Sequence, residues 1–136
     1  MKLLCLAVLF ALAVVGQCYT LGVPLGPVID HNAKEQIVWD ITNAAEKLIW
    51  KAEPHLRQKY AYYGHLLEAK SQLFQSSTTR YLIDAIFVEV RCMGDIACVP
   101  EDINPKRIQV RFTALDRRDP TNRIFFLEFD YRYRFV

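Results

Sequence analysis

The spacing of apolar positions near the start of the chain predicts one helix. Between residues 32 and 53, apolar residues recur three or four positions apart, which is the spacing of one face of an α-helix. The expected buried stripe consists of Ile37, Ile41, Ala45, Leu48, Ile49 and Ala52. Asn32 is placed to cap this helix, Glu35 to reach back to it as in a capping box, and Pro54 to end it. Trp39 and Trp50 flank the stripe and are expected to pack on a sheet.

After Gly64 the apolar period falls to two, which is the period of a β-strand. Strands are expected over residues 67–73, 81–92, 108–114 and 125–135, and residues 55–63 predict only a connector. The expected apolar faces of the first and last strands are Leu67, Ala69, Ser71 and Leu73, and Phe125, Leu127, Phe129, Tyr131, Tyr133 and Phe135. Consecutive strands should pair antiparallel, and the helix stripe should cover the apolar face of the sheet. We therefore predict an α+β fold with one long helix packed across a four- to five-stranded antiparallel sheet.

The first residues predict export. Lys2 precedes an uninterrupted apolar run at residues 3–15, and small residues follow, which is the pattern of a secretory signal peptide. A helical span of a bilayer core of about 30 Å needs a longer run. We expect a signal peptide at residues 1–18, one domain at residues 19–136, and a secreted, extracellular protein with no membrane span. Cleavage after Gly16 and cleavage after Cys18 both fit the pattern.

Cysteine spacing agrees with an oxidising compartment. Cys92 and Cys98 enclose a short segment that contains a glycine, which indicates a local disulfide. A zinc site lacks the further cysteine pair or nearby histidine that it would need. Cys18 either leaves with the signal peptide or remains as an odd thiol. A monomer is expected, with a dimer through Cys18 or through domain swapping as the alternative.

Charge and motifs argue against several function classes. The net charge of +2 falls to about +1 when Lys2 is removed, which does not suit a general nucleic-acid binder. The residues 131–135 mix arginine with aromatic residues, but acidic residues precede them, so an ordinary strand surface is the preferred interpretation. His31, His55 and His65 are scattered and no serine lies in a nucleophile elbow. Asp84 is expected to be partly buried and paired with an arginine of a neighbouring strand. We expect no enzyme, no cofactor and no metal site.

The residues 19–30 form an apolar tail that contains two prolines and two glycines, so no regular element is expected there. Such a tail docks either on its own domain or on another molecule. Both alternatives remain open from the sequence.

The order of these elements resembles that of the cystatins, which are secreted inhibitors of papain-like cysteine proteases. The resemblance is most specific over residues 67–92, which match the two strands around the family's first inhibitory hairpin. The family motif there is Gln-X-Val-X-Gly, and the matching residues are Gln72, Leu73, Phe74, Gln75 and Ser76. Cys92 and Cys98 look like the first of the two family disulfides, and the second has no counterpart. The resemblance implies a cystatin-like fold.

In the family, an N-terminal tail and two hairpins form a wedge that enters the protease cleft. The resemblance places Leu25 and Gly26 in the tail, residues 72–76 in the first hairpin, and Pro120 and Thr121 in the second. Phe74 and Ser76 replace the family's valine and glycine, and no tryptophan follows Pro120. The resemblance thus implies either an inhibitor of a papain-like cysteine protease or a non-inhibitory binding or host-defence protein with another extracellular protein as partner. A small-molecule carrier with a cone-shaped α+β pocket is a third hypothesis.

Overall fold

The computed structural model describes residues 26–136 apart from 76–77, 95–96, 119–120 and 122. The expected signal peptide, including Cys18, lies outside these residues. The elements in chain order are β1 (Ile29–Asp30), α1 (Gln36–Ala52), the 3-10 helix η1 (Pro54–Leu56), β2 (Tyr60–Gln75), β3 (Thr78–Met93), β4 (Ala97–Pro100), β5 (Arg107–Arg117) and β6 (Phe126–Phe135). None of the helices in the described part of the chain has the length and apolar character needed to cross a membrane.

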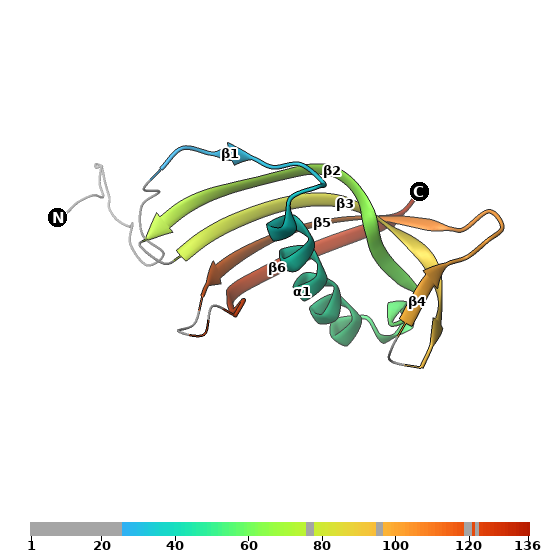
Figure 1. The fold of residues 1–136 in the computed structure, drawn as a ribbon. Helices are drawn as coiled ribbons and strands as arrows, with labels where there is room; N and C mark the ends of the chain where they lie inside the picture. The colour runs from blue at the N-terminus through green and yellow to red at the C-terminus, as the bar shows by residue number, and fades with distance from the viewer. Residues whose placement is uncertain (1–25, 76–77, 95–96, 119–120, 122) are drawn as a thin grey trace.

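The strands form one antiparallel sheet of six strands, and α1 packs against one face of it (Figure 1). The order across the sheet is β1-β2-β3-β5-β6, and the short strand β4 also pairs with β3. The predicted α+β class and the single long helix are therefore confirmed. The sheet has more strands than expected, because β4 forms where only a connection was predicted and β1 forms in the tail, where no regular element was expected. A strand of four residues is too short to show a period.

The helix α1 begins at Gln36 rather than at Asn32. The backbone N–H of Asn32 does donate to a carboxylate oxygen of Glu35 over 2.7 Å, as in a capping box. The side chain of Asn32, however, accepts the N–H of Lys34 over 2.9 Å and closes a turn two residues long. The chain therefore makes a separate turn before the helix, and Glu35 occupies the cap position. The predicted end of the helix before Pro54 is confirmed.

The buried stripe of α1 is rotated from the predicted one. Its fully buried residues are Val38, Ile41, Thr42, Ala45 and Ile49. Leu48 is 39% exposed and Ala52 is exposed, so both were wrongly placed in the core. The two sets share the same spacing, so the sequence could not separate them. The contacts of the tryptophans fix the rotation of the helix.

Both tryptophans pack on the sheet, as predicted. The indole N–H of Trp50 donates to the backbone oxygen of Tyr60 over 2.9 Å. The ring of Trp39 lies 4.8 Å from the ring of Tyr62, and its N–H donates to the backbone oxygen of Ala33 over 3.0 Å. Each ring thus joins the helix layer to β2 and keeps its polar group paired.

The first long strand starts earlier than expected, at Tyr60, and it is irregular. Its register with β3 shifts between Tyr62 and His65, between Leu66 and Glu68, and between Leu73 and Gln75. These bulges break the expected alternation of Leu67, Ala69, Ser71 and Leu73. Ala69 and Ser71 are buried, but Leu67 is 50% exposed and Leu73 is 41% exposed.

The last strand also departs from its predicted face at its beginning. A register shift between Leu115 and Asp116 directs Phe126, rather than Phe125 or Leu127, toward the core. A carboxylate oxygen of Asp116 accepts the N–H of Phe125 over 2.9 Å, which holds this irregular turn. The ring of Phe126 stacks on that of Phe129 at 5.7 Å. The rest of the strand alternates as predicted.

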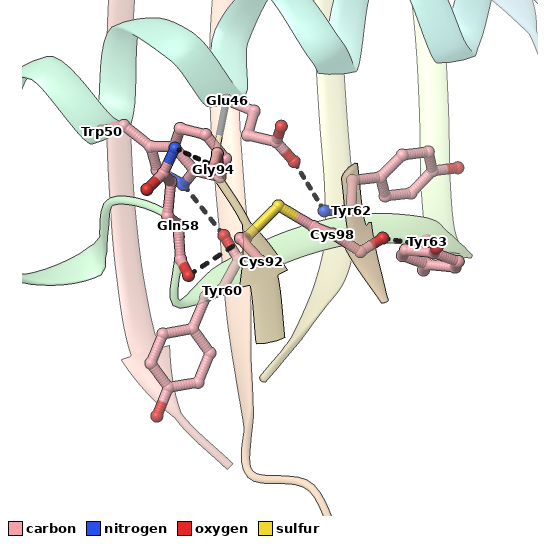
Figure 2. Close-up of a disulfide and its surroundings, with 9 residues drawn as sticks. All are labelled: Glu46, Trp50, Gln58, Tyr60, Tyr62, Tyr63, Cys92, Gly94 and Cys98. Atoms are coloured by element: carbon pink, nitrogen blue, oxygen red, sulfur yellow. Dashed lines mark hydrogen bonds between the residues drawn. A yellow bond between two sulfur atoms is a disulfide. The ribbon is translucent and has the colours of Figure 1, made fainter. Parts of the chain in front are cut away.

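Two further sequence predictions are confirmed in the sheet. Ile108, Val110, Phe112 and Ala114 alternate along β5 and are buried beneath α1. Cys92 and Cys98 form a disulfide between directly paired residues of β3 and β4 (Figure 2). The hydroxyl of Tyr63 donates to the backbone oxygen of Cys98 over 2.9 Å, so β2 contacts the disulfide-bonded end as well.

Substitution of Gly64 tests how much the bulge in β2 contributes to the stability of the fold. Its φ is +98°, and an added Cβ would lie 3.1 Å from the ring of Trp39, which its own contacts hold in place. We expect Gly64→Ala to lower the free energy of unfolding by about 2–3 kcal/mol, through backbone strain and steric overlap together. Gly94→Ala is the matched control, because Gly94 also has positive φ but has open space around it, and should cost about 1 kcal/mol. Urea denaturation measures both, and equal losses would contradict the role of Trp39.

Glu46 should make stability depend on pH. Burial raises the pKa of its carboxyl above the ordinary value of 4.5, and the hydrogen bond from the N–H of Tyr62 opposes this rise only in part (Figure 2). The folded protein therefore holds this proton more tightly than the unfolded chain, and that stabilisation is lost as the pH rises through the raised pKa. We expect Glu46→Gln to gain stability relative to the wild type as the pH rises from about 4 to about 8. Urea denaturation across this range would contradict the assignment if the difference stayed constant or fell.

Candidate functional site

The two long hairpins end side by side. Thr78, the first residue of β3, pairs with Arg117, the last residue of β5. The β2–β3 hairpin and the β5–β6 hairpin therefore reach the same end of the sheet, opposite the end that carries β4 (Figure 1). Gly26 of the tail lies beside β2 at this end. We call this region the hairpin end; it consists of Gly26, residues 72–79 and residues 117–126, as far as they are described.

Most of the site residues predicted from the sequence come together here. Gly26, Gln72, Leu73, Phe74 and Thr121 lie within the described residues, and Gln75 is the last residue of β2. Leu25, Ser76 and Pro120 lie outside the described residues.

The tail is docked on its own domain over the residues that the structure describes. The side-chain amide of Gln72 donates to the backbone oxygen of Gly26 over 2.9 Å. Ile29 and Asp30 pair with β2, and the N–H of His31 donates to the backbone oxygen of Ala69 over 2.9 Å. Of the two alternatives that the sequence left open, this segment therefore adopts docking on its own domain.

A second set of hydrogen bonds, made by His31, holds the tail. His31 bridges Glu35 and Ser71, with its Nδ1 at 2.8 Å from a Glu35 carboxylate oxygen and its Nε2 at 2.6 Å from the Ser71 hydroxyl. The hydrogen bond from His31, followed by that from the N–H of Asn32, lowers the pKa of the Glu35 carboxyl. Sequence reasoning missed this bridge because Ser71 lies forty positions from His31 and no motif connects them.

An acid, a histidine and a serine follow one another in this bridge, as in the catalytic relay of a hydrolase. The burial of Ser71, however, indicates a structural role. Ser71 is 8% exposed, and it pairs with β1 on one side and with β3 on the other. A nucleophile needs space for a substrate carbonyl and for donors to the oxyanion. The burial of Ser71 leaves no such space. The bridge therefore fastens the tail to β2 and to the turn before α1.

The tip of the first hairpin is partly covered by a cation. The guanidinium of Arg80 lies 4.9 Å from the centre of the Phe74 ring, and it also lies 3.8 Å from a carboxylate oxygen of Glu128. Phe74 is consequently half-buried. The larger apolar surface at this tip belongs to Leu73.

The second hairpin is braced at its base. Asp116 is buried and accepts the Nε–H of Arg118 over 2.9 Å, in addition to the N–H of Phe125. Thr121 is exposed, and its hydroxyl accepts the Nε–H of Arg123 over 3.0 Å. Phe125 is exposed next to this turn. The hairpin end therefore offers apolar side chains from two hairpins on a rigid base.

The contact between Gln72 and Gly26 can be tested directly. A net hydrogen bond of about 0.5–1.5 kcal/mol corresponds to a change of roughly two- to tenfold in local opening. We expect Gln72→Ala to speed amide hydrogen exchange of residues 28–31 by this factor, measured by mass spectrometry. Gln36→Ala is the control, because it removes an amide that contacts only Asp40 on the exposed side of α1 among the described contacts. Unchanged exchange in Gln72→Ala would show that the tail is held without this bond.

Comparison of the chain with models of known protein families found no match, and searches of curated proteins and of solved structures found none either.

Proposed function

We propose that this chain is a secreted cystatin-like protein that inhibits papain-like cysteine proteases by inserting its hairpin end into the protease cleft. The observation that carries the proposal is the row formed by the tail, the first hairpin and the second hairpin. Gln72 joins the first two of these segments, and the pair Thr78–Arg117 joins the last two. The order of one helix followed by an antiparallel meander supports the same proposal.

The physical properties of the hairpin end suit insertion into a groove. Leu73 and Phe125 of the hairpin end and Val28 of the adjoining tail are each at least 41% exposed. The tail is already tied down by Gln72 and His31, so less conformational freedom is lost on binding. The disulfide between Cys92 and Cys98 supports an oxidising, extracellular location.

A second candidate function is a binding protein of the same scaffold that does not inhibit proteases. It is favoured by the charges at the hairpin end. Arg80 covers Phe74, and Arg117 is exposed beside the second hairpin. Charged groups that lose water at an interface without a matching partner weaken binding to an apolar cleft. Such a surface would suit a more acidic partner protein.

Titration against papain separates the two candidates. The protein, with its disulfide formed, should inhibit cleavage of a peptide substrate reversibly. We expect Leu73→Asp to weaken inhibition by about 30-fold or more, because a central apolar anchor contributes about 2 kcal/mol or more to an interface.

Leu67→Asp is the matched control for this titration. Leu67 lies on the same strand and is similarly exposed, but it is distant from the hairpin end in the register of β2 with β3. Its inhibition constant should equal that of the wild type. Absence of inhibition at micromolar protein would overturn the inhibitor proposal for papain-like enzymes and favour the second candidate.

A further inference from the structure

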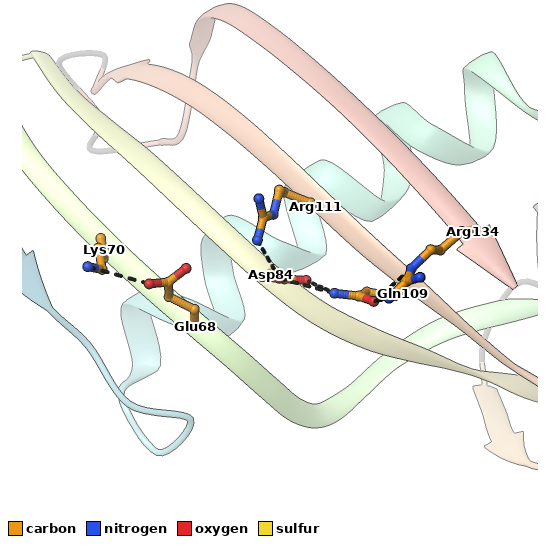
Figure 3. A network of polar contacts seen from close by, with 6 residues as sticks. All are labelled: Glu68, Lys70, Asp84, Gln109, Arg111 and Arg134. Atoms are coloured by element: carbon orange, nitrogen blue, oxygen red, sulfur yellow. Dashed lines mark hydrogen bonds and ion pairs between the residues drawn. The ribbon is translucent and has the colours of Figure 1, made fainter. Parts of the chain in front are cut away.

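A second surface lies on the face of the sheet that is turned away from α1. Five residues of β5 and β6 line a shallow depression of about 310 Å³ on the sheet: Gln109, Arg111, Arg132, Tyr133 and Arg134. Figure 3 shows Arg111, Gln109 and Arg134 in front of the sheet, with the helix behind it. Arg132 shares their face, because it alternates along β6 with Tyr131 and Tyr133, which contact the opposite layer.

The register of the sheet brings these arginines together. Arg111 and Arg132 are directly paired residues of β5 and β6, and Gln109 pairs with Arg134. Like charges directly opposite each other in a sheet are destabilising. Such an arrangement lowers the stability of the isolated protein, and an anion placed between the side chains would relieve the repulsion.

The cluster holds a single buried carboxylate. As predicted from the sequence, Asp84 is buried and paired, and it accepts from Arg111 over 3.0 Å and from the amide of Gln109 over 2.9 Å. Arg134 donates two hydrogen bonds to the side-chain oxygen of Gln109, which carries no charge. Within the described part of the chain, Arg132 has no hydrogen-bond or ion-pair partner. Of the three guanidinium groups, Arg111 alone contacts this carboxylate in the described part of the chain.

Two other cations of the same face, on β2 and β3, lie near acids. Lys70 lies 3.4 Å from a carboxylate oxygen of Glu68 and 3.9 Å from one of Asp30 (Figure 3). Arg80 lies 3.8 Å from Glu128. The excess of positive charge is thus local to the pair β5–β6, although the net charge of the whole chain is only +2.

We propose that this face binds a sulfated linear polysaccharide through Arg111, Arg132 and Arg134. Guanidinium groups donate two parallel hydrogen bonds to oxyanions, and three of them on adjacent strand positions fit a row of sulfate groups. A single-stranded nucleic acid would also need exposed rings on which bases stack. Tyr131 and Tyr133 are instead turned toward Glu53 and His55. The disulfide is typical of proteins in oxidising, extracellular compartments, where sulfated polysaccharides are available.

The test measures binding of the whole protein to heparin by titration calorimetry at several salt concentrations. The double variant Arg132→Gln, Arg134→Gln removes two cations from the cluster and leaves Arg111 on the buried Asp84. The control Lys47→Gln, Lys51→Gln removes the same charge from the exposed side of α1, away from the sheet. Thermal unfolding confirms that both variants are folded.

The proposal predicts a change in salt dependence. Each contact with a sulfate group should release about one counterion, as a phosphate contact does. The arginine variant lacks two of these contacts. Its loss of affinity between about 50 and about 200 mM salt should therefore be roughly tenfold smaller than that of the wild type. The lysine variant should keep the wild-type slope. Equal losses in both variants would show general charge attraction and overturn the site. Equal binding of desulfated heparin, or tighter binding of a single-stranded oligonucleotide of the same charge, would overturn the choice of ligand.

Discussion

The register of β3 with β5 is the constraint on which both proposed surfaces depend. β3 pairs with three other strands, β2, β4 and β5, and therefore forms the centre of the sheet. Ile83, Ala85 and Phe87 of β3 lie opposite Phe112, Val110 and Ile108 of β5, and all are buried under α1. A shift of one residue would turn this set outward and expose it to water. Burial of this shared face therefore fixes where the hairpins end and which residues face outward.

Irregular positions then shape the edges of this regular centre. Gly64 allows β2 to bulge against Trp39, and Asp116 holds the turn that admits Phe126 to the core. Bulges redirect side chains while the strand pairing continues on either side. Leu73, at the register shift that ends β2, and Phe125, at the turn that Asp116 holds, are exposed at the hairpin end. The same features that cost regular alternation thus provide the apolar surface that the proposed inhibition would use.

The two surfaces are spatially distinct and differ in chemistry. The hairpin end presents apolar side chains and a tail tied down by Gln72 and His31. The face that carries Arg111, Arg132 and Arg134 presents positive charge. These residues lie on β5 and β6 away from the hairpin end. Because Arg132 and Arg134 take no part in the hairpin contacts, binding of a polyanion on the sheet would leave the hairpin end accessible. One small domain could in this way be held on a sulfated matrix and still reach a protein partner.

The sequence by itself determined the helix that ends before Pro54, the four long strands, the pairing of Cys92 with Cys98 and the ion pair of Asp84. Each of these follows from local periodicity, from spacing along the chain, or from the high cost of burying a lone charge. The sequence also located the two hairpins. Only the tertiary structure decided the bridge from His31 to Ser71, the bond from Gln72 to Gly26, the strand β4 and the meeting of Arg111 with Arg132. These contacts join residues far apart in the chain, and they depend on strand register and bulges, which local patterns of apolar and polar residues do not encode.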